Sequence, residues 1–309
     1  MVMKRFRVTG HSMIPTLQPD QEVVTVDTRL ADPGNLVVFE HPERSGMWLV
    51  KRLTDHEGWV TSDNPYDSSN DSTTLGRLPI DILLPVVDRL DAESFAQGCA
   101  LLAAEDEALA ASIAQWGLPG FWNRRPGFQT LVLLVLEQQV TLESGAAMYR
   151  RLADLCGQVT PTAVMAVGDA GLRSIGVTRQ KSSYLVDLSR RVVDGDLDIG
   201  ALETAPLATA RSDLLSIRGI GPWTADAYLL SAGRRPDMWP VGDRALQVGT
   251  ADVLRMSHPP NEGELEIIGE PWRPIRAVAA RLIWHAYLSA RGRVEPPDAT
   301  LVHGVPAEA

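Results

Sequence analysis

The chain has 309 residues and a mass of 33.7 kDa, with 45% hydrophobic residues and a formal net charge of −10. Its length predicts two domains, and its hydrophobic fraction excludes a disordered chain. Two cysteines, Cys99 and Cys156, exclude a disulfide framework and a four-thiolate metal or iron–sulfur site, and the pI of 5.1, taken alone, argues against a nucleic-acid partner.

The N-terminal sequence MVMKRFRVTGHSM has basic residues with no apolar run after them, so it does not predict a secretory signal. The longest apolar stretch, LVLLVL at residues 131–136, is far shorter than the ~20 residues of a membrane-spanning helix. Free thiols fit a reducing compartment. We therefore expect a cytoplasmic protein with no membrane partner.

Residues 1–92 predict a small, mostly-β domain. EVVTVD, NLVVFE and MWLVKRL are short runs rich in valine and aromatic residues. Turn signals such as Gln18-Pro19-Asp20 and Asp63-Asn64-Pro65 separate them. This spacing is typical of a small antiparallel sheet or barrel.

Three sequence motifs follow one another in this region: GHSMIPTL around Ser12, VKR with Lys51, and DNPYDSSNDSTTLGRLP. Together they resemble the type I signal peptidase family, most closely the short members related to the nickel superoxide dismutase maturation protease. The resemblance implies that Ser12 is a nucleophile and that its amide helps to bind an oxyanion. Lys51 would be the base, which requires burial to lower its pKa.

This domain also departs from the family pattern. Thr73 stands where the family has arginine, and Arg77 is a candidate replacement. The last box has an extra residue, so Ser68 and Ser69 are both candidates for the serine that orients the lysine. A catalytically inactive binding module is therefore an alternative for this domain.

Residues 100–293 predict an all-α domain, because long segments rich in Ala, Leu, Arg and Glu have helical spacing. Thr160-Pro161 is a predicted helix start. Residues 294–309 contain two adjacent prolines and no periodicity, and predict a mobile tail. The whole chain is thus expected to be a two-domain α+β protein.

The segment LLSIRGIGPWTADAYLL predicts a tight turn, Gly219-Ile220-Gly221, between two helices. Glycines let the backbone approach a ligand, and Pro222 fits the first turn of the second helix. The unpaired amides of that helix start suit a phosphate. About twenty residues later, Asp243 lies at a predicted helix start.

These features lie among five boxes, in order: GFQTLVLLVLEQQVTLESGAA, GVTRQKSSYLVDLSRRVVDGDLD, LLSIRGIGPWTADAYLL, WPVGDRAL and PWRPIRAVAARLIWHAYL. They resemble the helix–hairpin–helix DNA glycosylases of the 3-methyladenine DNA glycosylase II family over residues ~106–293. The resemblance implies that Asp243 is the catalytic carboxylate and that Gln139 fills the gap left by the everted nucleotide. The DNA-binding residues it implies are Gln139, Arg218, Gly219, Ile220, Gly221 and Thr224.

One position predicts the subclass. Lyase-type relatives have a Schiff-base lysine directly after the hairpin, where this chain has Trp223. We therefore expect a monofunctional enzyme that leaves an abasic site and an uncut strand. Trp223 and Trp284 align with aromatic residues of the base pocket and would attract a cationic alkylpurine. Ala227 replaces a further pocket aromatic, which leaves the base range open.

The resemblance implies no required cofactor and no metal, although hairpin carbonyls in the family often bind a monovalent cation. The expected partner of this monomer is double-stranded DNA with alkylated bases, and the first domain would take a peptide. In one alternative, the peptidase is the main activity and the helical domain only targets DNA. In another, the junction SFAQGCALLAA is cleaved by the protein itself, as in a regulated repair protein.

The charge is unevenly distributed between the domains. Residues 1–98 have nine Lys+Arg and fifteen Asp+Glu, whereas residues 99–294 have 20 and 21. The helical part is nearly neutral, so the acidic pI does not exclude DNA binding by backbone amides, with Arg218, Arg244 and Arg276 as candidate helpers. Binding to undamaged DNA should be weak and sensitive to salt.

Overall fold

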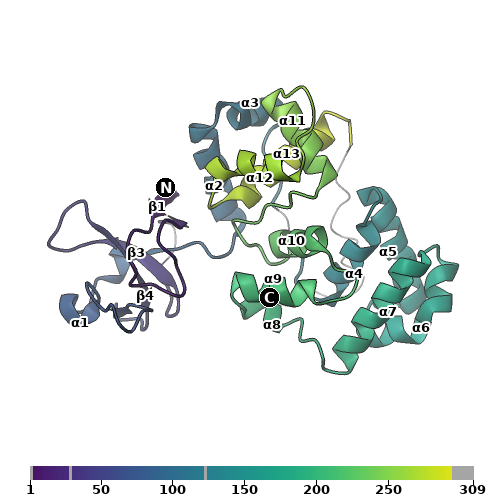
Figure 1. The fold of residues 1–309 in the computed structure, drawn as a ribbon, viewed down its shortest axis with the longest axis horizontal. Coiled ribbons are helices and arrows are strands. Elements are labelled where there is room, and N and C mark those ends of the chain that lie inside the picture. The colour runs from purple at the N-terminus through teal and green to yellow at the C-terminus, as the bar shows by residue number, and fades with distance from the viewer. Residues whose placement is uncertain (1–2, 28–29, 122–123, 294–309) are drawn as a thin grey trace.

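The computed structural model describes residues 3–27, 30–121 and 124–293, and it shows a β module followed by a helical body (Figure 1). The module contains two antiparallel sheets, one of two strands and one of four in the order β5-β4-β3-β6. Valine-rich runs form the central strands, since branched side chains pack well on a pleated surface. The strands are β1 Lys4–Arg7, β2 Glu22–Thr25, β3 Leu36–Glu40, β4 Trp48–Leu53, β5 Val60–Thr61 and β6 Leu84–Pro85.

Lys51 lies on β4, one of the two central strands of the larger sheet. Lys51 of β4 pairs with Val37 of β3, and a bridge between Thr25 and Val86 joins the two sheets. A short helix, α1 Ser72–Leu75, and a 3-10 turn, Ile80–Ile82, complete the module. The mostly-β prediction for this region is confirmed.

The helical body begins earlier than residue 100. Helix α2 starts at Ala92 with Asp91 as its N-cap, because Asp91 accepts from the Ser94 N–H. Phe95 and Cys99 of α2 are buried in the core of the body. The helices are α2 Ala92–Glu105, α3 Glu107–Trp116, α4 Phe128–Glu137, α5 Leu142–Cys156, α6 Pro161–Ser174, α7 Arg179–Val193, α8 Ala201–Thr204, α9 Leu207–Leu215, α10 Pro222–Ser231, α11 Arg244–Leu254, α12 Glu262–Gly269 and α13 Arg276–Ser289, with a 3-10 turn at Glu270–Trp272.

The helices lie in two groups with α10 between them (Figure 1). One group contains α2, α3 and α11–α13, and the other contains α4–α7. The predicted helix starts are present: Thr160 caps α6 with Pro161 in the first turn, Pro222 opens α10, and Asp243 caps α11.

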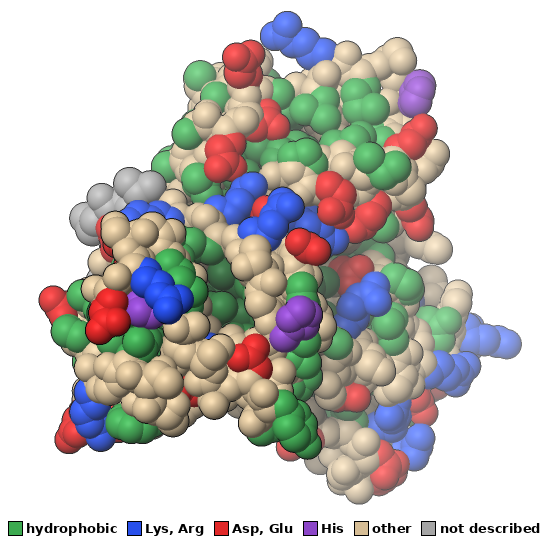
Figure 2. Space-filling model, turned by 60° about the vertical axis from the view of Figure 1, so that its left-hand side comes forward, with side chains coloured by type: hydrophobic (Ala, Val, Ile, Leu, Met, Phe, Trp, Pro, Cys, Tyr) green, Lys and Arg blue, Asp and Glu red, His purple; other side chains and the backbone are tan. Residues whose placement is uncertain are grey.

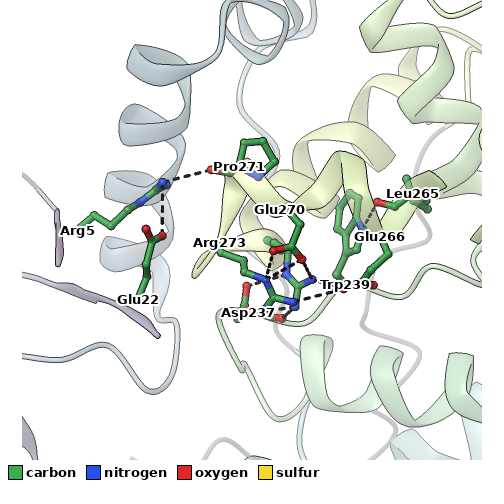
Figure 3. A network of polar contacts seen from close by, with 10 residues as sticks. Arg5, Glu22, Asp237, Trp239, Leu265, Glu266, Glu270, Pro271 and Arg273 are labelled. Atoms are coloured by element: carbon green, nitrogen blue, oxygen red, sulfur yellow. Dashed lines mark hydrogen bonds and ion pairs between the residues drawn. The ribbon is translucent and has the colours of Figure 1, made fainter. Parts of the chain in front are cut away.

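The β module packs against the helical body. Met3, Val24 and Val87 share one hydrophobic cluster with Phe95 and Leu102 of α2. Polar contacts join the same two parts. Arg5 Nη1 of β1 donates to Pro271 O at 3.2 Å (Figure 3), and the Leu90 N–H donates to Arg234 O at 2.8 Å. The module is thus docked through both apolar and polar contacts.

Among residues 3–27, 30–121 and 124–293, no helix has the length and apolarity to cross a membrane. The same residues contain no group of three or more His, Cys, Asp or Glu side chains arranged to hold a metal ion.

Candidate active site

The predicted hairpin lies between α9 and α10. Gly219 has a φ of +88°, a conformation that favours glycine, and α10 starts directly after Gly221. A Cβ on Gly219 would lie 2.2 Å from the ring of Tyr184. Ile220 is buried, so only its backbone can face a ligand. The hairpin therefore presents backbone groups at a helix start, as phosphate binding requires.

Two carbonyl oxygens at this hairpin are candidate ligands for the expected monovalent cation. Gly219 O accepts from the Gln138 side chain at 2.8 Å, and Ile217 O accepts from the Ile220 N–H at 3.0 Å. A carbonyl oxygen has two lone pairs, so each keeps one for a further partner. Oxygen donors of this kind fit a monovalent cation, which stays a prediction.

The Asp243 carboxylate is held by two indoles. Trp223 Nε1 of α10 donates to Asp243 Oδ2 at 2.7 Å, and Trp284 Nε1 of α13 donates to Oδ1 at 2.9 Å. The Leu246 N–H donates to Oδ1 at 2.7 Å, as expected of an N-cap. All three donors fix the orientation of the carboxylate. The sequence predicted Trp223, Asp243 and Trp284 as site residues, but it did not predict the hydrogen bonds between them.

Gln139 lies just past the end of α4 on the exposed surface, with a left-handed φ of +58°. Its neighbour Gln138 points inward instead, and its Nε2 donates to Gly219 O and to Thr224 Oγ1 at 3.0 Å. Thr224 is buried. Its hydroxyl is therefore turned toward Gln138, and only its backbone remains for the predicted DNA contact.

The three predicted basic helpers have different environments. Arg218 is exposed beside the hairpin, with its guanidinium 5.6 Å from the Tyr184 ring centroid, and Arg244 is exposed at the start of α11. Arg276 is only 7% exposed and binds Asp237 and Glu266 at 2.8 and 2.9 Å. The prediction for Arg276 is wrong, because this buried side chain is engaged in ion pairs within the protein.

Arg273 lies in the same network and contacts Glu270 at 3.0 Å (Figure 3). Beyond this network, acidic and basic side chains are interspersed over the face in Figure 2, with no single basic field.

Ser12 and Lys51 are brought together as predicted. Lys51 Nζ lies 2.8 Å from Ser12 Oγ and 2.9 Å from Ser62 Oγ. The lysine is 1% exposed, and this burial lowers its pKa from 10.5, against the opposing effect of Asp71. A lysine in such a setting can accept a proton from serine.

The serine that contacts the lysine is Ser62, not Ser68 or Ser69. Ser62 follows β5 directly, whereas Ser69 donates to Asp67 at 2.7 Å. Arg77 pairs with Asp55 at 2.7 Å and lies over Trp59, so its charge is used within the module.

A groove of about 220 Å³ opens beside this pair. Its walls include Ser12, Lys51 and Asp67 together with apolar side chains. Phe6 and Trp48 form part of the wall, with ring centroids 5.1 Å apart. Such a groove, with a polar pair at an apolar wall, can hold a small ligand or an extended chain.

Comparison with known proteins covers the helical body. Residues 132–274 match the family model of the HhH-GPD superfamily of base excision DNA repair proteins. A crystal structure of a DNA-3-methyladenine glycosidase from Bacillus halodurans is 30% identical, with a TM-score of 0.53, over 67% of this chain and 95% of that one. The chain belongs to the HhH-GPD superfamily. The residues matched to the family include both the hairpin and Asp243.

Two further relatives define the extent of the similarity. A DNA-3-methyladenine glycosylase of Bacillus subtilis is 32% identical over 44% of this chain and 41% of its own length. The chain therefore spans about two fifths of that curated relative. The Schizosaccharomyces pombe 3-methyladenine DNA glycosylase, solved with abasic DNA, is 21% identical with a TM-score of 0.56, over 61% of this chain and 95% of that one. It shows the shared fold, and the HhH-GPD family match begins after the β module.

The hairpin of this HhH-GPD protein should not tolerate a side chain at Gly219. We expect Gly219→Ala to destabilise the hairpin by about 1–3 kcal/mol from its backbone conformation, with a further cost from the Tyr184 ring. Binding to abasic duplex DNA, measured by fluorescence anisotropy, should weaken. Gly120→Ala is the control, because Gly120 lies outside the hairpin and nothing lies within 4 Å of its Cβ position. Equal binding by the two variants would contradict the expectation.

The indole N–H of Trp284 should matter beyond the area of its ring. Trp284→Phe keeps an aromatic ring but removes the donor to Asp243 Oδ1. A charge-assisted hydrogen bond contributes about 1.5–3 kcal/mol, so we expect base release to fall by about 10- to 150-fold. Single-turnover excision would measure this fall. Trp272→Phe is the control, since Trp272 donates to Asp106 instead; a larger loss in the control would count against the assignment.

Proposed function

We propose that this protein is a monofunctional DNA glycosylase that releases alkylated purines of the 3-methyladenine type in base excision repair. The observation that carries the proposal is the Asp243 carboxylate, held by the N–H groups of Trp223 and Trp284. The hairpin, which would bind the DNA backbone, leads directly into the helix that contains Trp223. The proposal includes a monomer that works in the cytoplasm on double-stranded DNA.

The chemistry follows from charge. A base inside a duplex cannot be reached, so the nucleotide must rotate out of the stack while Gln139 occupies the gap. The bond between C1′ and the base nitrogen then breaks, and its electron pair leaves with the alkylated base, which becomes neutral. The Asp243 carboxylate stabilises the positive sugar that results. A water oxygen bonds to C1′ and releases one proton, which gives the abasic sugar.

Trp223 sets the type of product. Strand cleavage by lyase-type enzymes needs an amine at this position, and an indole cannot form a Schiff base. Trp223 and Trp284 are half-buried, so part of each ring can meet an entering base. Their faces would favour a cationic alkylpurine over a neutral normal base. The half-buried Ala227 leaves room where a third aromatic ring would stand.

Release of methylated purines tests this proposal. Duplex DNA treated with a methylating agent would be incubated with the protein, and the free bases separated by chromatography. We expect 3-methyladenine and related cationic purines in the soluble fraction, with no release of normal bases. Soluble methylpurine at the level of the protein-free control would refute the proposed function.

For the β module we propose a second function, a serine–lysine peptidase. The separation of 2.8 Å between Lys51 Nζ and Ser12 Oγ and the adjoining groove support it. An extended peptide is the expected substrate. Two variants of this proposal are that the helical body only targets the peptidase to DNA, and that the module cleaves the junction around Gln97 in its own chain. The junction is part of helix α2, so this helix has to unfold locally before cleavage.

A further inference from the structure

Two loops that the proposed glycosylase would use on DNA come from distant parts of the sequence. One loop, residues 138–140, presents Gln139, and the other is the hairpin at residues 218–221. The Gln138 side chain joins them. Its Nε2 donates to Gly219 O at 2.8 Å and to Thr224 Oγ1 at 3.0 Å, across more than 80 residues of sequence.

Helix α7 contacts the first of these loops through Lys181. Lys181 Nζ donates to Leu136 O at 2.8 Å and to Gln138 O at 2.7 Å. These carbonyls lie at the C-terminal end of α4, where helix carbonyls have no partner within the helix. A cation is favoured there by the helix dipole. The bond to Gln138 O also fixes the peptide plane just before Gln139, whose φ of +58° is a restricted conformation.

The same helix contacts the second loop through Tyr184, three residues further along α7. The Tyr184 ring lies against Gly219 so closely that a Cβ on Gly219 would be 2.2 Å away. Gln180 Nε2 donates to the Tyr184 hydroxyl at 2.6 Å and orients the ring. Residues three or four apart share one helix face, so a single face of α7 holds both loops.

Burying the Lys181 ammonium costs free energy unless hydrogen bonds replace its lost hydration. The side chain is only 9% exposed. Burial therefore lowers its pKa, and its contacts are with backbone carbonyls. An apolar residue would fill this space with less desolvation. Lys181 therefore holds the two backbone carbonyls in place, which makes the loop at residues 138–140 rigid.

We propose that α7 braces the two loops, and that Lys181 and Gln138 are positioning residues for the eversion of the damaged nucleotide. The inference rests on the proposed glycosylase function. The brace fixes the spacing between Gln139, which enters the stack, and the hairpin, which holds the backbone. Loss of the brace should slow eversion of the nucleotide. The rate at which the bond between C1′ and the base breaks, once the base lies beside Asp243, should stay unchanged.

The test compares two duplexes with the full-length protein. Each duplex contains one 7-methylguanine, paired with cytosine in the first and placed opposite an abasic analogue in the second, where eversion is easier. We expect Lys181→Met to slow single-turnover release from the paired duplex by about tenfold or more. Release from the second duplex should stay within about threefold of wild type. A 2-aminopurine beside the lesion should show a slower fluorescence rise with the variant.

The controls separate a brace from a general structural role. Lys181→Arg keeps donors for both carbonyls and should restore most of the rate. Arg190→Met removes a cation from an exposed part of α7 and should have no effect. If Lys181→Met lowers the melting temperature, Gln138→Met tests the same brace from the other side. An equal loss on both duplexes, or no loss on the paired one, would overturn the inference, whereas inactive wild-type protein would refute the proposed function itself.

Discussion

Asp243→Asn should lower the rate of methylpurine release by about 100-fold or more. The substitution removes the negative charge that faces the developing positive sugar, and preorganised charge of this kind is a large contribution to catalysis. It also places an amide N–H₂ against an indole N–H, so one of the bonds from Trp223 and Trp284 is lost. Single-turnover excision from methylated duplex DNA would measure the loss.

The helix itself should survive this change. Asparagine is as good an N-cap as aspartate, so the bond to the Leu246 N–H can remain. Binding to abasic DNA, which depends on the hairpin, should stay near the wild-type value. Asp252→Asn on the same helix is the matched control, because Asp252 pairs with Arg291 away from the indoles. Base release by Asp243→Asn at the wild-type rate would exclude the assigned role.

Ser12→Ala should abolish acylation of the β module by p-nitrophenyl acetate. The wild-type Ser12 hydroxyl is 2.8 Å from a buried amine and should take up an acetyl group, seen by peptide mapping and mass spectrometry. Lys51→Met should abolish the same acetylation, because serine without a base is a weak nucleophile. Ser69→Ala is the control, since Ser69 lines the same groove.

The pH dependence of this acetylation has a defined direction. Only the neutral amine of Lys51 can accept the serine proton, so the rate should rise with pH and then level off. Because burial lowers the pKa of Lys51, the plateau should begin below the ordinary lysine value of 10.5. The glycosylase should be unaffected by Ser12→Ala. Acetylation of Ser12 that persists in Lys51→Met would contradict the dyad.

The sequence predicted the features of the fold that depend on local signals. Thr160-Pro161 marked the start of α6, and Gly219 marked a turn that needs a positive φ. The start of α2 was harder. Asp91 and Ala92 follow a strand-like segment with no glycine between. The start of the helix is shown by the capping box, in which the Ser94 N–H donates to Asp91 Oδ1 and the Asp91 N–H donates to Ser94 Oγ.

The sequence could not predict contacts that depend on how distant helices pack. The residues Trp223, Asp243 and Trp284 were identifiable from their boxes, but the bonds between them need α10, α11 and α13 to converge. Arg276 shows the opposite case. A basic residue near a candidate site suggests a phosphate contact, and only the packing of α13 reveals its partner Asp237.

We propose that the Asp243 site releases an alkylated purine and leaves the strand uncut. The most direct measurement uses an end-labelled duplex with a single 7-methylguanine and analyses both the free base and the labelled strand. We expect release of free 7-methylguanine with a full-length strand that breaks only after treatment with alkali. A strand cut by the protein without alkali, or no free base, would contradict it.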